Sequence, residues 1–330
     1  MRVVHCGAAS EIARFSESPG RQHFNPSDFE THHADIHLCV LSENSDVQAR
    51  CSLWWNDVPA HGQYRVGIVG HYFAATADAA AAVLAGAQKQ LREAGCTLAI
   101  GPMNGNTWRS YRFVTESGGE PAFFLEPENP PEWPLQFEKA GFSSLASYVS
   151  ALNSDLSRPD PRADAVESKL AEAGVKIRPA ISDLRRELDN IYAVSQVSFR
   201  QNFLYAEIPK AEFVAMYEPV LVVSRPELVL IAENADQCVG YLFAIPDLAL
   251  RARGLKVDTF IIKTVAIIPQ PELRGLGTLL VARAQQRGRE MGFRRCIHAL
   301  MFTDNISLNI SRHYAAAMRK YTLYSKDLAK

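Results

Sequence analysis

The part of the chain best suited to chemistry is a β-branched stretch that leads into a glycine-containing turn. Val265-Ala266-Ile267-Ile268 is followed by Pro269 and then by Arg274-Gly275-Leu276-Gly277-Thr278, which opens a helical pattern. Glycines let a backbone turn tightly with its N–H groups facing one concavity, and a helix N-terminus adds partial positive charge. The sequence therefore predicts an anion site of the kind that holds a pyrophosphate. A plain strand-to-helix turn is the alternative, because Gly-x-Gly alone is common.

Four side chains near this turn carry groups that could transfer a proton or repel a cationic substrate. Asp258, at the start of the same strand, is a candidate base, although an Asp at a strand start is more often a turn residue. The strand has no Glu, and Lys263 on it would repel a cationic amine. Tyr314 has a phenol suited to protonating a thiolate, or it anchors a short helix. His298 is a core histidine or a proton relay, and the sequence favours the former.

Two further segments are rich in aromatic and polar side chains. Residues 104–112 contain Trp108 and Tyr111 and follow a strand end, where open α/β folds place sites. Residues 199–205 contain Phe203. Residues 104–112 could line an acceptor pocket between two halves of the chain, and the favoured alternative is a Trp and a Tyr that pack a short helix. The aromatic residues of 199–205 would suit an apolar acceptor, and core packing explains them equally well.

Composition narrows the classes of function. The chain has 330 residues, with 35 Lys and Arg against 36 Asp and Glu and no block of like charge. We therefore expect no nucleic-acid partner and no polybasic membrane surface. An 18-residue apolar stretch and a signal-peptide pattern are both missing from the sequence. The six cysteines are scattered without metal or redox spacing, which favours reduced thiols and a cytoplasmic location.

The histidines of the first half do not predict a metal centre. His33 and His37 are four residues apart, which would suit one metal ion on a helix. The segment runs into a predicted strand, and neither a carboxylate nor a cysteine completes the set. We expect no metal site.

Elements follow one another in the same order on both sides of a polar, Pro-containing connection at 153–164. In the second half we expect strands and helices at 176–180, from Ser182, 210–217, 227–232, 238–245, 257–268, from the turn to Gly292, 296–302, 304–313 and 319–325. In the first half we expect them at 1–6, 36–41, 50–55, 64–73, from the cap Thr76 to Gly95, 96–100, 106–113 (a helical turn) and 145–151. We expect two domains, 1–160 and 161–330, in line with roughly 150 residues per domain.

The order of strand, Arg274-Gly275-x-Gly277 turn, helix, strand, and a helix beginning near Asn305 resembles the GCN5-related N-acetyltransferases. The resemblance covers residues 175–326 with motifs and the first half by element order alone. It implies an α/β (α+β mixed sheet) fold class with two tandem GNAT-like domains, each a central, mostly antiparallel sheet flanked by helices. The first-half turn, 70–76, lacks the motif, and its bulky His71, Tyr72 and Phe73 should crowd the phosphate position. We therefore expect a degenerate first copy.

The resemblance also implies acetyl-CoA, or another acyl-CoA, as the cofactor. It places the pantetheine arm against one short strand segment and the pyrophosphate on the turn. The backbone N–H of Ile267 could polarise the acyl carbonyl. The sequence departs from the family at Leu279, where Gly or Ala is usual, at two extra residues around 270–271, and at Tyr314, which is offset by about two positions from the usual acid. The implied contacts are Ala266, Ile267 and Ile268 for pantetheine, Arg274, Gly275, Leu276, Gly277, Thr278 and Leu279 for pyrophosphate, and Asn305 for the cofactor arm.

The expected function is an acyl-CoA-dependent N-acyltransferase, most simply an acetyltransferase, that acts on a small-molecule amine. The C-terminal domain would bind the donor, with Tyr314 and Asp258 as catalytic residues and Trp108, Tyr111 and Phe203 near the acceptor. One alternative is an aminoacyl or acyl-carrier-protein-dependent transferase of the same fold, although the absence of a basic stripe counts against a tRNA-borne donor. The other alternative is a non-catalytic acyl-CoA-binding protein, which is consistent with the missing Glu on the strand. The sequence predicts no particular oligomeric state.

Overall fold

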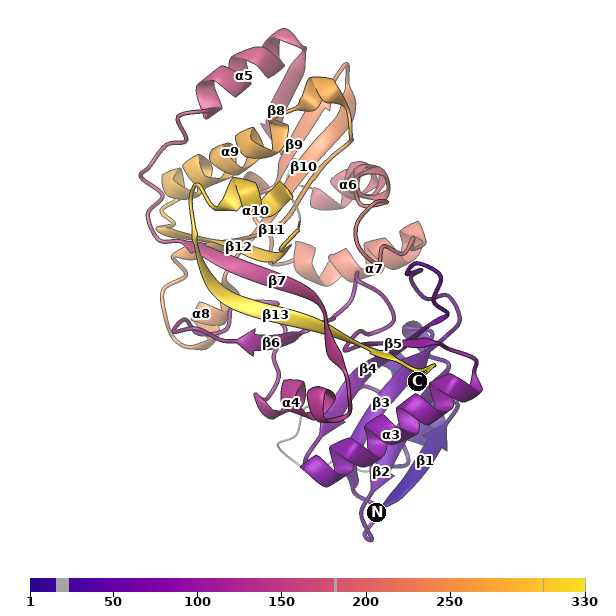
Figure 1. The fold of residues 1–330 in the computed structure, drawn as a ribbon. Helices are drawn as coiled ribbons and strands as arrows, with labels where there is room; N and C mark the ends of the chain where they lie inside the picture. Colours follow the sequence, from indigo (N-terminus) through magenta and orange to yellow (C-terminus); the bar gives the residue numbers. More distant parts are fainter. Residues whose placement is uncertain (16–23, 181–182, 305, 330) are drawn as a thin grey trace.

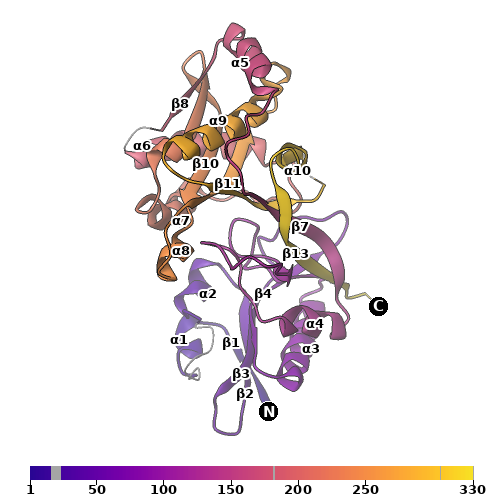
Figure 2. The same ribbon diagram turned by 90° about the vertical axis from the view of Figure 1, so that its left-hand side faces the viewer.

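A single mixed β-sheet runs through the protein in the computed structural model, which describes residues 1–15, 24–180, 183–304 and 306–329. The sheet has 13 strands in the order β1-β2-β3-β4-β5-β13-β7-β12-β11-β10-β9-β8, and β6 pairs with β13 at one side. Figures 1 and 2 show an elongated molecule whose two helix-covered parts are joined by the long strands β7 and β13.

The first half contributes β1 (Arg2–Cys6), α1 (Ala9–Ile12), α2 (Ser27–Thr31), β2 (Ile36–Leu41), β3 (Val47–Trp54), β4 (Val66–Ala74), α3 (Ala77–Glu93), β5 (Leu98–Gly101), β6 (Phe113–Glu116), α4 (Glu132–Lys139) and β7 (Ser143–Asn153). The second half contributes α5 (Ala163–Glu172), β8 (Val175–Pro179), α6 (Leu184–Ser198), α7 (Lys210–Leu221), η1 (Pro226–Leu228), β9 (Leu230–Asn234), β10 (Gln237–Pro246), α8 (Leu248–Ala252), β11 (Thr259–Ile267), η2 (Pro271–Leu273), α9 (Leu276–Glu290), β12 (Arg295–Phe302), α10 (Ile306–Ser311) and β13 (Ala316–Asp327).

The expected repeat of element order is present, and so is the mixed sheet. β4 is parallel to β5, β11 is parallel to β12, and the remaining pairs are antiparallel. The Thr76 side chain caps α3 by accepting from the Ala79 N–H at 3.2 Å, as the sequence predicts. The predicted cap Ser182 lies outside the described residues.

The helical turn predicted at 106–113 is wrong. These residues form irregular turns, and β6 begins at Phe113. The cause is long-range pairing of the backbone on either side of this segment. The Met103 N–H donates to the Val69 carbonyl at 2.9 Å, and the Arg112 N–H donates to the Pro102 carbonyl at 2.8 Å. Sheet contacts therefore override the local helical pattern.

The two halves exchange strands across the predicted boundary at 160/161. β7, from the first half, pairs with β12 of the second half, with Asn153 opposite Cys296. β13, the last strand of the chain, pairs with β5 of the first half, with Tyr324 opposite Gly101. Figure 1 shows both strands crossing between the two parts. Each part of the sheet is therefore completed by a strand from the other side of the boundary, and the boundary itself stays a prediction.

Helices cover both faces of the second-half sheet. On β11, Phe260 and Ile262 pack with α9 and α5, whereas Ile261 and Ala266 pack with α6 and α7. Alternate residues of a strand face opposite sides of a sheet, so α9 and α6 lie on opposite faces. A gap between β11 and β12 would therefore join the face of the sheet that carries α9 to the face that carries α6.

Candidate acyl-donor site

An opening in the sheet separates the second halves of β11 and β12. The two strands pair from Thr259 opposite Arg295 to Ile262 opposite His298, and β11 then continues to Ile267 without this partner. Both strands are irregular where they part. The β10 register skips Lys263, so this residue is a bulge on β11, and the β12 register against β7 shifts between His298 and Met301.

Backbone groups of β11 face this opening. The Ile268 N–H donates to the Val239 carbonyl at 3.0 Å, so it points toward β10. Because neighbouring residues of a strand direct their backbone groups to opposite edges, Ile267 and Val265 direct theirs into the opening. Ala266 is 2 % exposed, and its backbone faces β10. Among the residues predicted to meet pantetheine, Ile267 is therefore placed to form backbone hydrogen bonds, and Ala266 could contribute only its side chain.

The Arg-Gly-Leu-Gly turn forms the N-terminus of α9. Gly275 adopts a left-handed conformation with φ of 101°, and a Cβ on it would lie 2.9 Å from Val166 Cγ1. A Cβ on Gly277 would lie 3.1 Å from Ile267 Cδ1. Both positions therefore suit glycine, for conformational and steric reasons.

The first backbone amides of α9 are available to a ligand. Within the described part of the chain, the N–H groups of Gly275, Leu276, Gly277 and Thr278 donate to no backbone or side-chain acceptor, as the geometry of a helix start requires. The Arg274 side chain beside them is exposed. The turn therefore fits the diphosphate of an acyl-CoA.

Leu279 does not cover the turn. Its side chain is 2 % exposed and packs in the core beneath α9 with residues of α5 and β8. The core therefore accommodates the larger side chain at this position, where Gly or Ala is usual in the family. Asn305, predicted to contact the cofactor arm, lies outside the described residues.

Tyr314 lies just after α10 and is held by a carboxylate. Its hydroxyl donates to Asp160, which also accepts from Arg162 Nε at 2.9 Å and Nη2 at 2.6 Å. Burial, followed by the hydrogen bond to Asp160, raises the pKa of Tyr314 far above its ordinary value. The hydrogen bond from Arg162 is the main cause that lowers the pKa of Asp160. Tyr314 is therefore a protonated phenol throughout the physiological pH range.

His298 lies beside Tyr314, with ring centroids 6.0 Å apart. Its Nδ1 is 2.9 Å from Ser311 Oγ, and its Nε2 has no hydrogen-bond partner among the described residues. Burial lowers the pKa of His298 to about 4, so the ring is neutral at physiological pH. Its one partner is structural, in keeping with the favoured interpretation as a core histidine.

The structure does not bring Asp258 to the turn. It precedes β11 by one residue, and eight residues of strand separate it from Ala266, a distance of about 26 Å. Its Oδ1 accepts from Thr259 Oγ1 at 3.1 Å, and its carbonyl accepts from the Arg294 N–H at 2.8 Å. Asp258 therefore joins β11 to the start of β12, far from the opening.

A loop from the first half reaches the opening, a feature that the sequence did not indicate. Phe123 is 2 % exposed and packs in the same core as Ala266. Glu126 accepts from Tyr321, and its Oε1 lies 3.0 Å from Arg319 Nε on β13. The Leu125 carbonyl accepts from Lys263 Nζ at 3.3 Å.

A second first-half residue faces the same place from the β12 side. Arg112 Nη1 donates to the Leu300 carbonyl at 3.2 Å, at the irregular part of β12. The Leu300 N–H donates to Ser150 Oγ at 3.0 Å. The point where β11 and β12 part is thus lined by charged residues from both halves. The first-half residues lie far from β11 and β12 in the sequence, so no local sequence pattern could predict that they would line this point.

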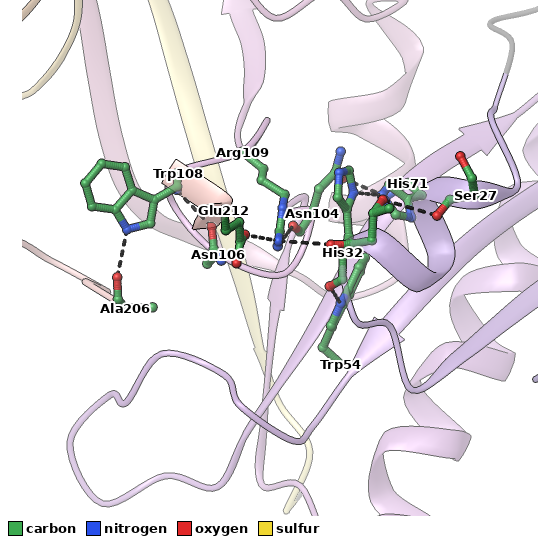
Figure 3. Close-up of polar contacts among 11 residues, drawn as sticks. Ser27, His32, Trp54, His71, Asn104, Asn106, Trp108, Arg109, Ala206 and Glu212 are labelled. Carbon is green, nitrogen blue, oxygen red and sulfur yellow. Dashed lines mark hydrogen bonds and ion pairs between the residues drawn. The ribbon is translucent and has the colours of Figure 1, made fainter. Parts of the chain in front are cut away.

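The two predicted acceptor segments are in contact, because Thr107 Oγ1 donates to the Leu204 carbonyl at 3.4 Å and the ring of Trp108 packs edge-on against that of Phe199. Figure 3 shows how Trp108 and Arg109 contact residues of the second half. Trp108 Nε1 donates to the Ala206 carbonyl at 2.7 Å, and Arg109 forms an ion pair with Glu212. Trp108 packs edge-on against Phe213, with centroids 5.6 Å apart. The segment containing Trp108 therefore joins the first half to α7.

The three predicted acceptor residues are not gathered into one pocket. Trp108 belongs to the core between the sheet and α6 and α7. Tyr111 packs edge-on against Tyr148 at 5.5 Å, and Phe203 stacks on Phe302 at 5.5 Å, both in a separate core around β7 and β13. Core packing thus accounts for much of their aromatic character.

The equivalent opening of the first half is closed. β4 and β5 pair only from Val66 to Ile68, and the β3 register shows an extra residue on β4 near His71. A Cβ on Gly70 would lie 1.9 Å from the Met103 carbonyl oxygen, and the His71 N–H donates to Asn104 Oδ1 at 2.8 Å. The segment after β5 therefore fills the space between the strands.

The three bulky side chains of the first-half turn, which the sequence predicts to crowd the phosphate position, are all buried. Tyr72 and Phe73 are each 6 % exposed within the first-half core, and the Tyr72 hydroxyl donates to Gln136 at 2.7 Å. His71 Nε2 is 2.8 Å from His32 Nδ1, as Figure 3 shows, and its Nδ1 is 2.8 Å from Ser52 Oγ. Main chain, and not these three side chains, closes the opening.

The described residues include no group of three or more His, Cys, Asp or Glu placed to hold a metal ion. They also include no helix with the length and apolar character that crossing a bilayer requires.

Comparison with known proteins identifies the fold. No protein-family profile and no curated protein sequence matches the chain. Among solved structures, the chain is similar to a tandem GNAT protein from the clavulanic acid biosynthesis pathway, with 12 % identity and a TM-score of 0.52, covering 99 % of this chain and 98 % of that one. It is also similar to a GCN5-related N-acetyltransferase from Anabaena variabilis, with 11 % identity, a TM-score of 0.53 and coverage of 99 % and 73 %.

A third similar structure is larger. The GCN5-related glucosamine N-acetyltransferase region of a fungal multi-domain GH3 β-N-acetylglucosaminidase matches with 12 % identity and a TM-score of 0.56. The match covers 98 % of this chain and 38 % of that one, so the chain spans well under half of that protein. The chain is a tandem protein of the GCN5-related N-acetyltransferase (GNAT) fold.

Proposed function

We propose that the protein is an acyl-CoA-dependent N-acyltransferase, most simply an acetyltransferase, that acts on a small-molecule amine. The observation that carries this proposal is the difference between the halves. The second half combines an open strand pair with a glycine turn of free amides, whereas main chain closes the equivalent opening of the first half. In this proposal, residues 161–330 hold the donor and residues 1–160 form a degenerate copy.

The binding roles follow from the exposed backbone. The amides of Gly275 to Thr278, with Arg274, would hold the diphosphate at the positive end of α9. The backbone of Ile267 would bond the pantetheine arm, since it faces the opening. Acyl-CoA supplies the thioester, whose carbonyl carbon accepts the amine.

Tyr314 is our candidate for the general acid. Its phenol stays protonated and already donates a hydrogen bond, so it could donate instead to a thiolate as the C–S bond breaks. Asp258 is not retained as the base, because it lies at the far end of β11. The amine would enter from the side of α6 and α7, where Phe123 and the loop around it form part of the wall.

Isothermal titration with acetyl-CoA tests donor binding, and Arg274→Ala tests its location. Loss of one charged contact should weaken binding by about 1.5–3 kcal/mol, roughly ten- to a hundredfold. Arg289→Ala is the matched control, because Arg289 is also exposed but lies at the opposite end of α9. No binding by the wild-type chain, or equal loss in both variants, would refute the proposed donor site.

Thiol release across a panel of amines then separates an enzyme from a binding protein. Sustained release of CoA with at least one amine is the expected result. Donor binding without release for any amine would instead favour a non-catalytic acyl-CoA-binding protein.

A further inference from the structure

Lys263 is the extra residue in the bulge of β11, at the point where the opening begins. Its neighbours in register, Ile262 and Thr264, lie opposite consecutive residues of β10, so Lys263 stands outside the ladder. The side chain is half-buried, and its Nζ donates to the Leu125 carbonyl at 3.3 Å. No ion pair joins it to a carboxylate anywhere in residues 1–15, 24–180, 183–304 and 306–329.

Burial, together with the neighbouring Arg112, disfavours the ammonium form of Lys263. Burial is the main cause that lowers the pKa of Lys263 to about 8, and Arg112 lowers it further, while Glu126 opposes them. Glu126 is already engaged by Tyr321 and Arg319. At pH 8 the neutral amine fraction of such a lysine is roughly a hundredfold larger than that of an ordinary lysine with a pKa near 10.4. A neutral amine is the form that can act as a nucleophile.

The proposed direction of the donor would bring its reactive end toward this amine. The diphosphate would lie at the α9 turn, and the arm would run back along β11 past Ile268 and Ile267. The acyl group would therefore continue toward Val265 and Lys263. Four residues of strand separate Ile267 from Lys263, about 13 Å.

We propose that Lys263 is a self-acylation site, which takes the acyl group from donor bound to the same chain. The inference rests on the proposed function, because it needs acyl-CoA at the α9 turn. The Lys263 Nζ lone pair attacks the thioester carbonyl carbon, the C–S bond breaks, and a proton passes from the nitrogen to the CoA thiolate. The products are an Nε-acyl-lysine amide and free CoA thiol, so no further reactant is required.

Acylation would change the site without breaking its contacts. The amide nitrogen keeps one N–H, which can still donate to the Leu125 carbonyl. The positive charge at the opening disappears, however, and with it the repulsion of a cationic amine. The modification would thereby favour entry of a protonated acceptor.

Mass spectrometry of the full chain after incubation with acetyl-CoA at pH 8 tests the proposal without any substitution. Peptide mapping should find acetylation at Lys263 roughly tenfold or more faster than at Lys256, an exposed lysine shortly before β11. Arg274→Ala should slow the reaction at Lys263 and leave Lys256 unchanged.

Two variants extend the test. Lys263→Arg, which keeps the charge, should abolish the fast adduct, whereas Lys256→Arg should retain it. If acetyl-CoA binds but Lys263 reacts no faster than Lys256, or reacts equally in Arg274→Ala, self-acylation is refuted and the donor site stands. If calorimetry shows no donor binding to the wild-type chain, both proposals fall.

Discussion

At the scale of single residues, a carboxylate holds Tyr314, the proposed general acid. It lies beside α10, on the face of the sheet that carries α9, and Asp160 fixes its hydroxyl. The sequence suggested this tyrosine from its position but not its partner. Asp160 lies in the connection between the halves, far from Tyr314 in the chain, and no local pattern links them.

Tyr314→Phe should lower kcat for CoA release about a hundredfold and leave KM for acetyl-CoA nearly unchanged, because a general acid acts in the transition state. Steady-state thiol release measures both constants. Tyr324→Phe is the control, since that hydroxyl donates to Glu138 at 3.2 Å in the first half. A Tyr314→Phe enzyme within twofold of wild type would remove the tyrosine from the mechanism.

Buried histidines should make the protein sensitive to mild acid. Burial lowers the pKa of His37 to about 3, of His71 to about 2 and of His298 to about 4. Unfolded histidine titrates near 6.5, so the unfolded state binds protons first as the pH falls. The free energy of unfolding should therefore hold above about pH 7 and fall below about 6.5. Each histidine should cost about 1.4 kcal/mol at pH 5.5 relative to pH 7.5.

Urea unfolding at the two pH values measures this loss. His37→Asn should make the loss of unfolding free energy smaller by the contribution of one histidine. Asn keeps a polar partner for Ser52, whose Oγ lies 2.7 Å from His37 Nδ1. Equal unfolding free energies of the wild-type chain at both pH values would show that these rings are not buried and neutral.

At the scale of elements, the strand, turn and helix from β11 to α9 could be predicted because their signals are local. β-branched residues, the glycine turn and a 3.6-residue apolar period lie next to one another in the chain. The loop holding Phe123 and Glu126 has no such period, and its role depends on β13, some 195 residues away. The failed helical turn at 106–113 has the same origin, since distant strands dictate its backbone.

The close approach of α9 to β11 gives a prediction at this scale. A Cβ on Gly288 would lie 2.4 Å from Cε1 of Phe260, whose ring is fully buried. Gly288→Ala should therefore lower the free energy of unfolding by about 1–3 kcal/mol, because the added methyl group overpacks the core. The higher helix propensity of Ala offsets part of this loss. Gly86→Ala in α3 is the matched control, since its Cβ would meet only Leu38 and Val3 at 3.7 and 3.8 Å.

Chemical denaturation of the two variants separates these effects. Gly86→Ala should stabilise the protein by up to about 1 kcal/mol, the gain in helix propensity. A Gly288→Ala protein as stable as the Gly86→Ala protein would contradict the contact between α9 and β11.

At the scale of the whole molecule, the two halves are related in architecture and differ at one place. The strand pair β11–β12 is open, whereas main chain closes the space between β4 and β5. The exchange of β7 and β13 ties them into one sheet, and residues of the first half reach the opening of the second. The sequence could predict the repeat from element order. It could not predict the exchange, because both halves offer a strand suited to either place.

The central claim is that the second half holds the donor. A crystal structure of the protein with CoA tests it most directly. The account predicts the diphosphate at the amides of Gly275 to Thr278, with the arm along Ile267 and the sulfur directed toward Lys263. CoA seated instead at the start of α3, near Thr76, or on a surface away from the opening between β11 and β12, would contradict it.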